Sequence, residues 1–585
     1  MNNRITALCK TLIGKLLSSL KRFPEAILLA ASVVSVLIYT NHFGFDLTAD
    51  AREMLRRIAM TLALGIPVSL CMKTLFERMP ALKTAVKALV YAGAAGGLLL
   101  YCLFLLKDFE MVSVTRYTAF SIALYLAFTF IPYFLKKDNY ELYVIKLLTN
   151  FFITYLYSAV LFLGLAAMLF TINALFLLDI SSKLYFDIWL IVAGVFAPAY
   201  FLADIPGHKE KVHQESFPVV FKVLLLYIVM PLLIAYSTIL YVYFAKIVFT
   251  RQWPDGLVSH LVLWYSFAGI LVLFFVFPLR KINRWVNTFV SFYPKLIIPL
   301  LAMMFVSMGI RINAYGITEN RYFVMAAGLW VAGSFIYYIV KKDVRNILLP
   351  VSLALVAVLT VTGPWSAYGI SRLSQNMRFE NILERHEMIR DGNIALPSED
   401  LSMEDKREIS AIIRYFGRYH DLNDLKYLPD GFTTDQTEEL FGFEYNYDLR
   451  GSNTKEYFRY YLTEDNMPIE IGDYDYFANF TISKHAGMDS AVGPVSVSYS
   501  ADTKELQIME EGQRVYSANL SELISRLYQN LDDNKPMNTG QMSYKDQTQN
   551  VKVLYVFKSI NGWKDRLNDQ LEVESVDFYI FVKIK

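Results

Sequence analysis

Apolar residues recur through residues 24–363 in long windows separated by short polar segments. A helix needs about 20 apolar residues to cross roughly 30 Å of hydrocarbon, because each residue adds about 1.5 Å. The windows are residues 24–42, 57–76, 84–106, 113–135, 147–171, 184–204, 219–246, 257–279, 291–310, 322–341 and 346–363. This pattern predicts a membrane all-α helical bundle of about 11 transmembrane helices.

The pattern changes at Gly363 and Pro364, which are expected to end the last apolar helix. Two amphipathic helices are predicted, over residues 371–389 and 402–419, the second with Ser402 and Asp405 as its cap. From about residue 430, apolar and polar side chains alternate as in strands. The predicted strands lie in FGFEYNYDL, EYFRYYLT, YFANFTIS, PVSVSYS and ELQIME and over residues 551–558 and 571–584, with a helix over residues 520–531. This part is therefore predicted to be a soluble α+β domain.

Charge divides the chain at the same place. Residues 1–369 hold 32 Lys and Arg against 17 Asp and Glu, a net charge of +15, and residues 370–585 hold 24 against 37, a net charge of −13. With 55% hydrophobic and 19% charged residues, the chain is too apolar for an ordinary soluble protein. The predicted domains are a cytoplasmic amphipathic helix (1–23), a polytopic transmembrane domain (24–363), a helical junction region (364–430) and an extracytoplasmic strand-rich domain (431–585). The lipid bilayer is the predicted partner, and no feature indicates nucleic acid.

Basic residues predict how the helices are oriented in the membrane. Residues 4–22 place leucines among lysines and arginines, the pattern of a cationic amphipathic helix on an anionic membrane face. Basic clusters then fall in alternate loops, at Lys136/Lys137, Arg280/Lys281/Arg284 and Lys342/Arg345. Since basic loops are retained in the cytoplasm, we predict a multi-pass plasma-membrane protein with a cytoplasmic N-terminus and an extracytoplasmic C-terminal domain. If the short window 346–363 were re-entrant, that domain would lie in the cytoplasm.

Motifs for a metal, a cofactor or a catalytic nucleophile are absent from the sequence. Cys9, Cys71 and Cys102 have neither metal-ligand nor disulfide spacing, and we interpret His208 and His213 as residues of a solvated loop. The chain has no GxxxxGK[ST], HExxH or GxSxG motif. Any transport would therefore be driven by a gradient or by another protein.

Five segments carry a resemblance to a known family: RFPEAILLA, PGHKEKVHQESFP, RQWPDG, IRINAYGITENRYF and GPWSAYGISRLSQ, in that order. Together they resemble the domain-of-unknown-function 4153 family of bacterial multi-pass membrane proteins, over roughly residues 20–400. YGITENRY is the most distinctive of these motifs. The resemblance implies a plasma-membrane protein of the bacterial cell envelope and carries no agreed activity.

The segment IRINAYGITENRYF is the principal candidate site. Arg311 is expected to end one helix and Arg321 to open the next, with Gly316 allowing the tight turn between them. Arginine suits bidentate recognition of phosphate or carboxylate, and positive charge is disfavoured on the predicted outer side. We therefore predict a site for an anionic lipid headgroup or a lipid-linked substrate. Its predicted residues are Arg311, Asn313, Tyr315, Thr318, Asn320, Arg321 and, from a second outer segment, Arg251.

A simpler interpretation of the same segment stays open. Both arginines would extend to the membrane interface, Tyr315 and Tyr322 would anchor the helix ends, and Glu319 would neutralise a neighbour. For catalysis, the candidate bases are Asp46, Asp50 and Glu319. A membrane glycosyltransferase with a polyprenyl-phosphate donor would combine such a base with a phosphate-binding arginine. Acidic residues of outer loops are equally typical of solvated groups, so whether the protein is an enzyme stays open.

Two further classes of function remain. A secondary transporter requires ionisable groups near the middle of the membrane, whereas Asp179, Asp187 and Asp204 lie near the ends of predicted spans. A non-catalytic envelope sensor or assembly factor would bind an envelope polymer or a protein partner through the outer domain, whose tyrosine-rich strands suit such contacts. No motif separates these classes.

Overall fold

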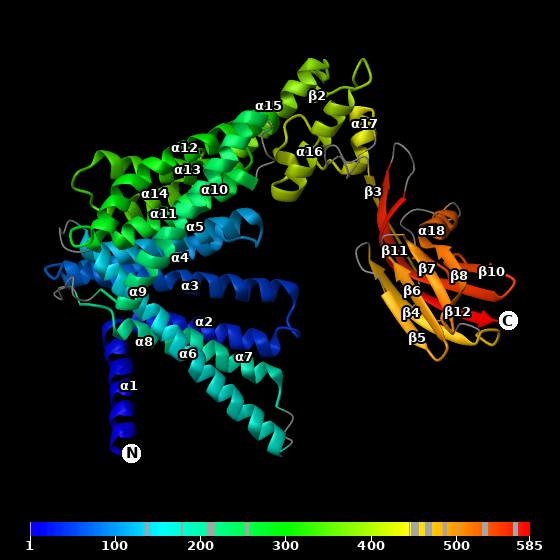
Figure 1. The fold of residues 1–585 in the computed structure, drawn as a ribbon. Coiled ribbons are helices and arrows are strands. Elements are labelled where there is room, and N and C mark those ends of the chain that lie inside the picture. The colour runs from blue at the N-terminus through cyan, green and yellow to red at the C-terminus, as the bar shows by residue number, and fades with distance from the viewer. Residues whose placement is uncertain are drawn as a thin grey trace. The chain divides into compact units, whose positions relative to one another are not determined.

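The computed structural model describes most of the chain and divides it into two compact units (Figure 1). The described residues are 2–134, 140–176, 180–207, 217–251, 257–443, 445, 455–462, 471–483, 488–501, 503–528, 536–565 and 571–585. The first unit is Met1–Tyr445 and the second is Asn446–Lys585. The predicted junction region, residues 364–430, therefore belongs to the same compact unit as the apolar helices.

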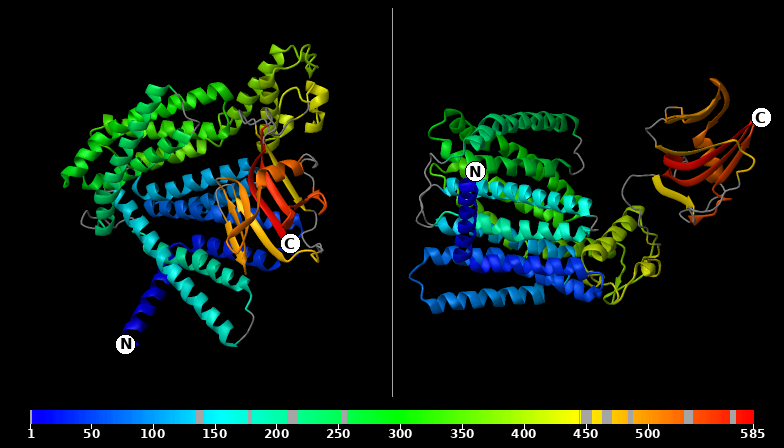
Figure 2. Two further views of the ribbon diagram at one scale, coloured as in Figure 1. Left: turned by 45° about the vertical axis from the view of Figure 1, so that its right-hand side comes forward. Right: turned by 90° about the horizontal axis from the view of Figure 1, so that it is seen from below.

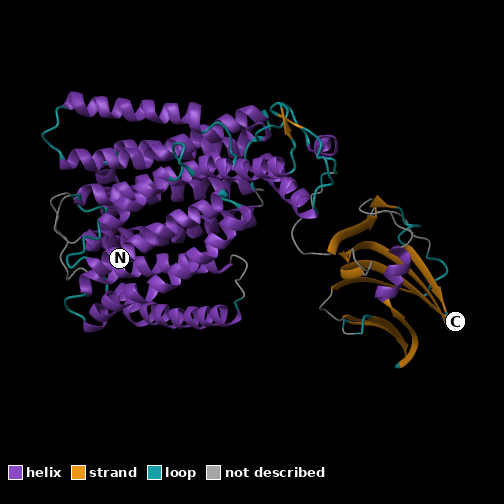
Figure 3. Ribbon diagram, turned by 90° about the horizontal axis from the view of Figure 1, so that it is seen from above, coloured by secondary structure: helices purple, strands orange, loops and turns teal. Residues whose placement is uncertain are grey.

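Within the described residues, ten helices are long and apolar enough to cross a membrane. In chain order they are α2 (Pro24–Phe43), α3 (Ala49–Arg78), α4 (Thr84–Leu100) with η1 (Tyr101–Leu105), α5 (Met111–Phe130) with η2 (Ile131–Tyr133), α6 (Tyr140–Phe176), α7 (Ser182–Ile191) with η3 (Val192–Phe196) and α8 (Ala197–Ala203), α9 (Val219–Val223) with η5 (Leu224–Val229) and α10 (Met230–Thr250), α11 (Leu257–Val276) with η6 (Phe277–Leu279), α12 (Arg284–Tyr315), and α13 (Glu319–Val340). Figure 3 shows them side by side. The predicted membrane helical bundle is confirmed.

The eleventh predicted window, 346–363, forms a shorter helix, α14 (Leu348–Leu359), of 12 residues. At about 1.5 Å per residue, α14 alone is too short for roughly 30 Å of hydrocarbon. Three hydrogen bonds join this segment to α13 in antiparallel order: Tyr338 Oη to Asn346 Oδ1, Trp330 Nε1 to Ser352 Oγ, and Tyr322 Oη to the Trp365 carbonyl. Because Tyr322 and Tyr338 are about 24 Å apart along a helix, the chain from Asn346 to Trp365 runs beside most of α13.

This path defines two ends of the bundle. The tail end holds the α12–α13 turn, residues 315–318, and the connection from α14 to α15 (Ala367–Arg385). The opposite end holds residues 79–83, between α3 and α4, and residues 341–347, between α13 and α14. The helix α15 and the chain that follows it therefore start at the same end of the bundle as the α12–α13 turn.

The N-terminal helix α1 (Asn2–Arg22) runs across the spans rather than along them (Figures 1 and 2). Lys15 Nζ pairs with Asp204 at 2.7 Å, and Leu16 packs against the apolar cluster that contains Phe23 and Ile27. A basic helix that lies across the helix ends has the geometry of an interfacial amphipathic helix.

The helical junction packs around a core of its own. Phe379 and Ile382 of α15 are buried against Ile409 and Phe416 of α16 (Met403–Tyr419). The predicted cap of α16 is confirmed, since Ser402 Oγ accepts the Asp405 N–H at 3.1 Å. The shorter elements are β1 (Ile389–Arg390), β2 (Asn393–Ile394), η7 (Leu422–Asp424), η8 (Thr434–Gln436) and α17 (Thr437–Phe441).

The strand predicted in FGFEYNYDL is wrong where the segment is described. Phe441 ends α17, and Gly442 follows in the left-handed region at φ 73°. Phe441 and Phe443 are buried in the core of the junction, so the aromatic alternation there reflects packing between helices. Residues 444 and 446–449 of this segment lie outside the described residues.

The second unit contains two sheets that share one apolar core. The six-stranded sheet has the order β4-β12-β11-β3-β9, with β10 paired to β11, and the four-stranded sheet has the order β5-β6-β7-β8. The strands are β3 (Lys455–Leu462), β4 (Tyr476–Ser483), β5 (Met488–Val492), β6 (Val495–Ser500), β7 (Glu505–Glu510), β8 (Gln513–Asn519), β9 (Pro536–Met537), β10 (Ser543–Gln547), β11 (Val551–Asp565) and β12 (Leu571–Ile584). Alternate residues of β12, Phe578, Ile580 and Val582, enter the core beside the helix α18 (Leu520–Tyr528). The predicted α+β domain is confirmed.

Candidate functional site at the tail end of the bundle

The α12–α13 turn forms where the sequence predicts it, around Gly316. Gly316 has φ 67° and ψ −177°, a region that is essentially restricted to glycine. A Cβ at this position would lie 2.6 Å from Arg378 Cδ. Ser374 Oγ accepts the Ile317 N–H at 2.9 Å, and Gln375 Nε2 donates to the Ile317 carbonyl at 2.9 Å. Glycine therefore serves both the backbone of the turn and the close approach of α15.

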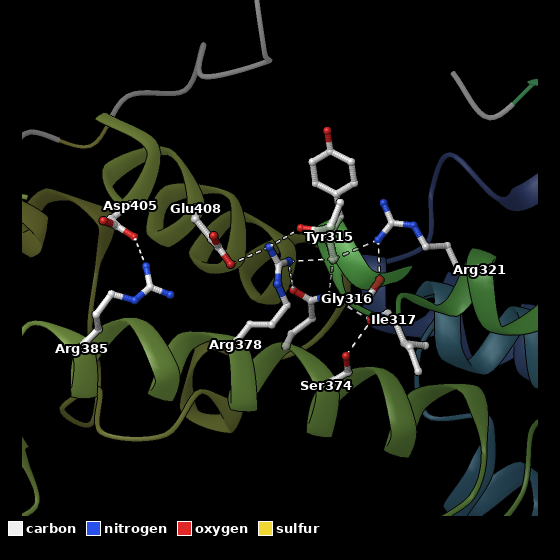
Figure 4. Close-up of polar contacts among 11 residues, drawn as sticks. Tyr315, Gly316, Ile317, Arg321, Ser374, Arg378, Arg385, Asp405 and Glu408 are labelled. Atoms are coloured by element: carbon white, nitrogen blue, oxygen red, sulfur yellow. Dashed lines mark hydrogen bonds and ion pairs between the residues drawn. The ribbon is translucent and has the colours of Figure 1, made fainter. Parts of the chain in front are cut away.

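Two arginines bind the exposed carbonyls at the C-terminus of α12 (Figure 4). Arg321 Nη1 donates to the carbonyls of Tyr315 and Gly316 at 3.0 and 2.7 Å. Arg378 Nη1 donates to the Tyr315 carbonyl at 2.7 Å. Carbonyls at a helix C-terminus lack intrahelical partners and carry the negative end of the helix dipole, so they attract cations. Because a carbonyl has no net charge, these bonds hold the guanidinium groups without neutralising them.

A third arginine, Arg311, lies close enough to Arg321 for their charges to interact, as does Arg378. Arg378 also pairs with Glu408 at 2.6 Å. Arg311 is partly exposed and makes no hydrogen bond or ion pair within the part of the chain that the structure describes. The turn thus gathers three guanidinium groups, of which one is bonded to a carboxylate.

The other predicted residues of the turn lie at its surface. Asn313, Tyr315 and Asn320 are exposed, and Thr318 is partly exposed. The Arg321 guanidinium lies over the Tyr315 ring at 5.5 Å from its centroid. These side chains surround the arginine cluster, and their assignment to a ligand stays a prediction.

Glu319, by contrast, is buried and bonded inside the protein. Its Oε1 accepts a hydrogen bond from Tyr415 Oη at 2.6 Å and lies 2.7 Å from His420 Nε2. Only 6% of the Glu319 side chain and 4% of the His420 side chain are exposed. Burial, followed by the hydrogen bond to Glu319, raises the pKa of Tyr415, so the hydroxyl remains a donor at neutral pH. The structure therefore pairs Glu319 with α16 and its C-terminal cap, and not with an arginine of the turn.

The remaining predicted residues are not joined to this cluster. Asp46 and Asp50 are exposed, between α2 and the first turn of α3. Arg251 is exposed at the C-terminal cap of α10, with φ 54°, and residues 252–256 lie outside the described residues. Within the described chain, no hydrogen bond or ion pair joins Asp46 or Asp50 to Arg311.

A second polar network stabilises the junction behind the turn. The carboxylate of Asp405 binds Arg385 Nη1 at 3.0 Å, His386 Nε2 at 3.0 Å and Ser402 Oγ at 2.6 Å. Burial alone would raise the pKa of Asp405, but the hydrogen bonds from Ser402 and His386 and the nearby positive charges lower the pKa below its ordinary value. This network fixes the start of α16, which carries Tyr415.

Carboxylates in the described spans lie at helix ends, as the sequence predicts. Asp187 binds Asn41 Nδ2 at 2.9 Å, and Asp204 pairs with Lys15. Asp179 lies outside the described residues. These contacts join one helix to another and give no specific support to a transport path.

Sequence reasoning missed the residues that reach this site from other elements. Tyr415 and His420 are 96 and 101 positions from Glu319, and no local pattern indicates that pairing. Arg116 of α5 also reaches the tail end, where its Nε donates to the Val361 carbonyl at 3.4 Å. It was detectable, because it is the one charged residue of α5 and ionisable residues inside spans often mark functional positions.

The ten long apolar helices of the described residues define the class of the molecule, a multi-pass membrane protein. Residues 26–386 match the family described as Domain of unknown function (DUF4153), and the chain belongs to this family, as the resemblance implied. The matched region includes the α12–α13 turn and α15.

A curated relative is the Uncharacterized protein PM1469 of Pasteurella multocida (strain Pm70), which is 24% identical over 371 residues. The alignment covers 59% of this chain and 62% of the relative, so the chain spans less than two thirds of that protein's length. No solved structure matches the chain.

Proposed function

We propose that the tail end of the bundle binds the phosphate of a phosphate-bearing lipid or lipid-linked substrate in the outer leaflet of the bacterial plasma membrane. The observation that carries this proposal is the gathering of Arg311, Arg321 and Arg378 around one helix end. Their bonds go mainly to neutral carbonyls, so positive charge remains available to an anion. Guanidinium groups bind phosphate through charge-assisted, often bidentate hydrogen bonds.

Aromatic side chains support a position at headgroup depth. Tyr315 is 57% exposed and Trp365 is 54% exposed beside the turn, and Tyr322 Oη donates to the Trp365 carbonyl at 2.6 Å. Tyrosine and tryptophan are enriched where hydrocarbon meets the headgroups. The arginine cluster would therefore face lipid phosphates directly.

Basic residues support the proposed orientation. Arg280, Lys281 and Arg284 lie at the opposite end, where Lys341 and Lys342 also lie, and such basic segments are retained in the cytoplasm. In this orientation the tail end and the C-terminal domain are extracytoplasmic. An impermeant thiol reagent applied to intact cells should label Arg450→Cys and leave Asn283→Cys unlabelled. The reverse result would place the site in the inner leaflet.

Binding is favoured over catalysis because Glu319, the carboxylate of the loop, is held by Tyr415 and His420. A general base must reach the proton that it removes, and a buried carboxylate with two internal partners does not face the surface.

Arg311→Gln tests the proposal, because Arg311 has no bond to lose within the described residues. The matched control is Arg284→Gln, at the opposite end of the same helix, where the Arg284 side chain is exposed and, like that of Arg311, makes no hydrogen bond or ion pair with the described residues. Purified protein would be measured by native mass spectrometry after extraction from membranes that contain phosphatidylglycerol and phosphatidylethanolamine. We expect wild type and Arg284→Gln to retain phosphatidylglycerol. Arg311→Gln should retain about ten times less of it, a difference in binding free energy of about 1.4 kcal/mol.

Equal retention by the two variants would contradict the proposal. So would a wild-type protein that shows no preference for the anionic lipid. Thermal unfolding of both variants in the same detergent serves as the folding control, and their midpoints should agree with the wild-type value.

A further inference from the structure

A cavity of about 350 Å³ lies at the tail end, between α5 and the α14–α15 connection. Its walls include two arginines, Arg116 of α5 and Arg372 of α15, together with Ser366, Tyr368 and Gly369. No carboxylate is among the residues that line it. A cavity with two cationic side chains and no acidic one is suited to an anion.

Arg116 is held in place by groups that leave its charge intact. Its Nε donates to the Val361 carbonyl at 3.4 Å, and its guanidinium lies over the Tyr368 ring at 5.6 Å from the centroid. Tyr368 Oη in turn donates to the Val112 carbonyl at 3.3 Å. Both Nη atoms of Arg116 lack a hydrogen bond to the described residues, so two donors remain for a ligand.

Arg372 and the first turn of α15 form the facing wall. Arg372 Nη1 pairs with Asp424 at 3.0 Å, and its other guanidinium nitrogens make no bond to the described chain. Ser366 caps α15 by accepting the Gly369 N–H at 3.3 Å. A Cβ on Gly369 would lie 2.3 Å from the Pro364 carbonyl oxygen, so glycine permits the close turn that shapes this wall. The N-terminus of α15 adds the positive end of its dipole to the charge of the two arginines.

We infer that this cavity is the subsite that holds the phosphate itself, with Arg116 and Arg372 as its ligands. The inference rests on the proposed function and deepens it, because it assigns the ligand to residues outside the α12–α13 turn. Ligand pockets commonly measure roughly 300–1,000 Å³, so a cavity of about 350 Å³ has room for a phosphate with a small attached group, and the acyl chains would lie outside it. The ligand class is therefore an amphiphile whose phosphate is terminal or carries a small polar substituent. Arg311, near the C-terminus of α12 at the same end of the bundle, would then contribute to attracting the ligand.

Arg116→Gln and Arg372→Gln test the subsite in the full-length protein. Each would be compared with wild type, Arg311→Gln and Arg284→Gln for retention of phosphatidylglycerol by native mass spectrometry. We expect a loss of at least tenfold in each cavity variant. Arg116→Lys keeps the charge but not the planar fork, and it should recover only part of the retention.

A second arm separates a lipid from a soluble anion. Inorganic phosphate and glycerol 3-phosphate would be added to delipidated protein, and the thermal midpoint would be followed. We expect a smaller rise from either anion than from phosphatidylglycerol, and no rise in Arg116→Gln. If inorganic phosphate matches the lipid, the cavity is a site for soluble phosphate and the lipid assignment is overturned.

The outcomes distinguish the subsite from the proposed function. If Arg311→Gln loses the lipid while Arg116→Gln and Arg372→Gln retain it, the cavity assignment fails and the surface site stands. If wild type shows no preference for phosphatidylglycerol, both fail. Should Arg116→Gln unfold, Arg372→Gln decides the result, because the Arg372 contact with Asp424 lies on the partly exposed junction.

Discussion

The two ends of the helical bundle differ in the groups that bind their basic side chains. At the opposite end, both oxygens of Glu77 bind Arg22, each at 2.9 Å, and Asp204 binds Lys15 at 2.7 Å. At the tail end, Arg321 binds carbonyls of the α12–α13 turn, and Arg57 Nη2 binds the Cys102 carbonyl at 2.7 Å. Arg22 and Lys15 are thus paired with carboxylates, whereas Arg321 and Arg57 are positioned by carbonyls and keep their charge.

The difference teaches how a binding surface is distinguished from a structural contact. A guanidinium that binds both oxygens of one carboxylate, as Arg22 binds Glu77, is neutral as a pair and offers little to an outside anion. A guanidinium on a carbonyl is positioned and still cationic, and a surface with oriented, unneutralised cations is prepared for an anionic ligand. Each end has exceptions: Arg378 pairs with Glu408 and Arg372 with Asp424 at the tail end, and Arg78 Nη1 donates to the Ile131 carbonyl at 2.9 Å at the opposite end. The distinction therefore concerns the individual contacts and not every cation of an end.

The largest effect is expected where the tail end depends on a buried carboxyl group. The double variant Tyr415→Phe/His420→Ala leaves Glu319 buried without its two partners, which we expect to lower the free energy of unfolding by about 3 kcal/mol. Thermal unfolding in detergent measures the loss, and hydrogen exchange should show that α16 opens first. With Glu319→Gln added, most of the loss should be recovered. A double variant as stable as wild type would show that the Glu319 contacts do not fasten α16.

At the opposite end, Arg22→Ala should lower the free energy of unfolding by about 2 kcal/mol. The variant loses the pair with Glu77 and the hydrogen bond from Arg22 Nη1 to the Ile205 carbonyl at 2.6 Å. A double-mutant cycle with Glu77→Ala measures the coupling between the two residues. Phosphatidylglycerol retention should not change. A loss of that lipid in Arg22→Ala would break the distinction between the ends.

Gly316→Ala should destabilise the tail end by about 1–3 kcal/mol, because alanine is strained in this backbone region and its Cβ would displace Arg378. Gly309→Ala, on the same helix, is the matched control, since no atom lies within 4 Å of a Cβ there. That variant should gain up to about 1 kcal/mol from helix propensity. Equal thermal midpoints for the two variants would show that the α12–α13 turn does not require glycine at position 316.

The smallest effect concerns pH. Because the folded protein lowers the pKa of Asp405, its contribution to stability is present above the unfolded pKa of about 3.9 and is lost as the pH falls through the folded pKa. Asp405→Asn should flatten the stability profile below about pH 4. Asp400→Asn is the control, because the Asp400 side chain is 83% exposed. Identical acid-unfolding curves for wild type and Asp405→Asn would show that the Asp405 network does not contribute to stability at low pH.

The sequence predicted much of the fold and only part of the site. Long apolar windows and Gly316 are local signals, so the spans and the α12–α13 turn follow from them. The partners of Glu319 come from α16 and its cap, and Arg378 comes from α15. Such pairings depend on how the helices pack, which no spacing in the chain encodes. The strand predicted at Phe441 failed for a related reason, because aromatic alternation is produced by helix packing as well as by a sheet.

The difference between the ends can be observed directly by cryo-electron microscopy of the protein in phosphatidylglycerol nanodiscs. We expect an ordered phosphate density at the tail end, within hydrogen-bond reach of Arg116 and Arg372. Ordered phosphate only at the opposite end, near Arg22, would contradict it.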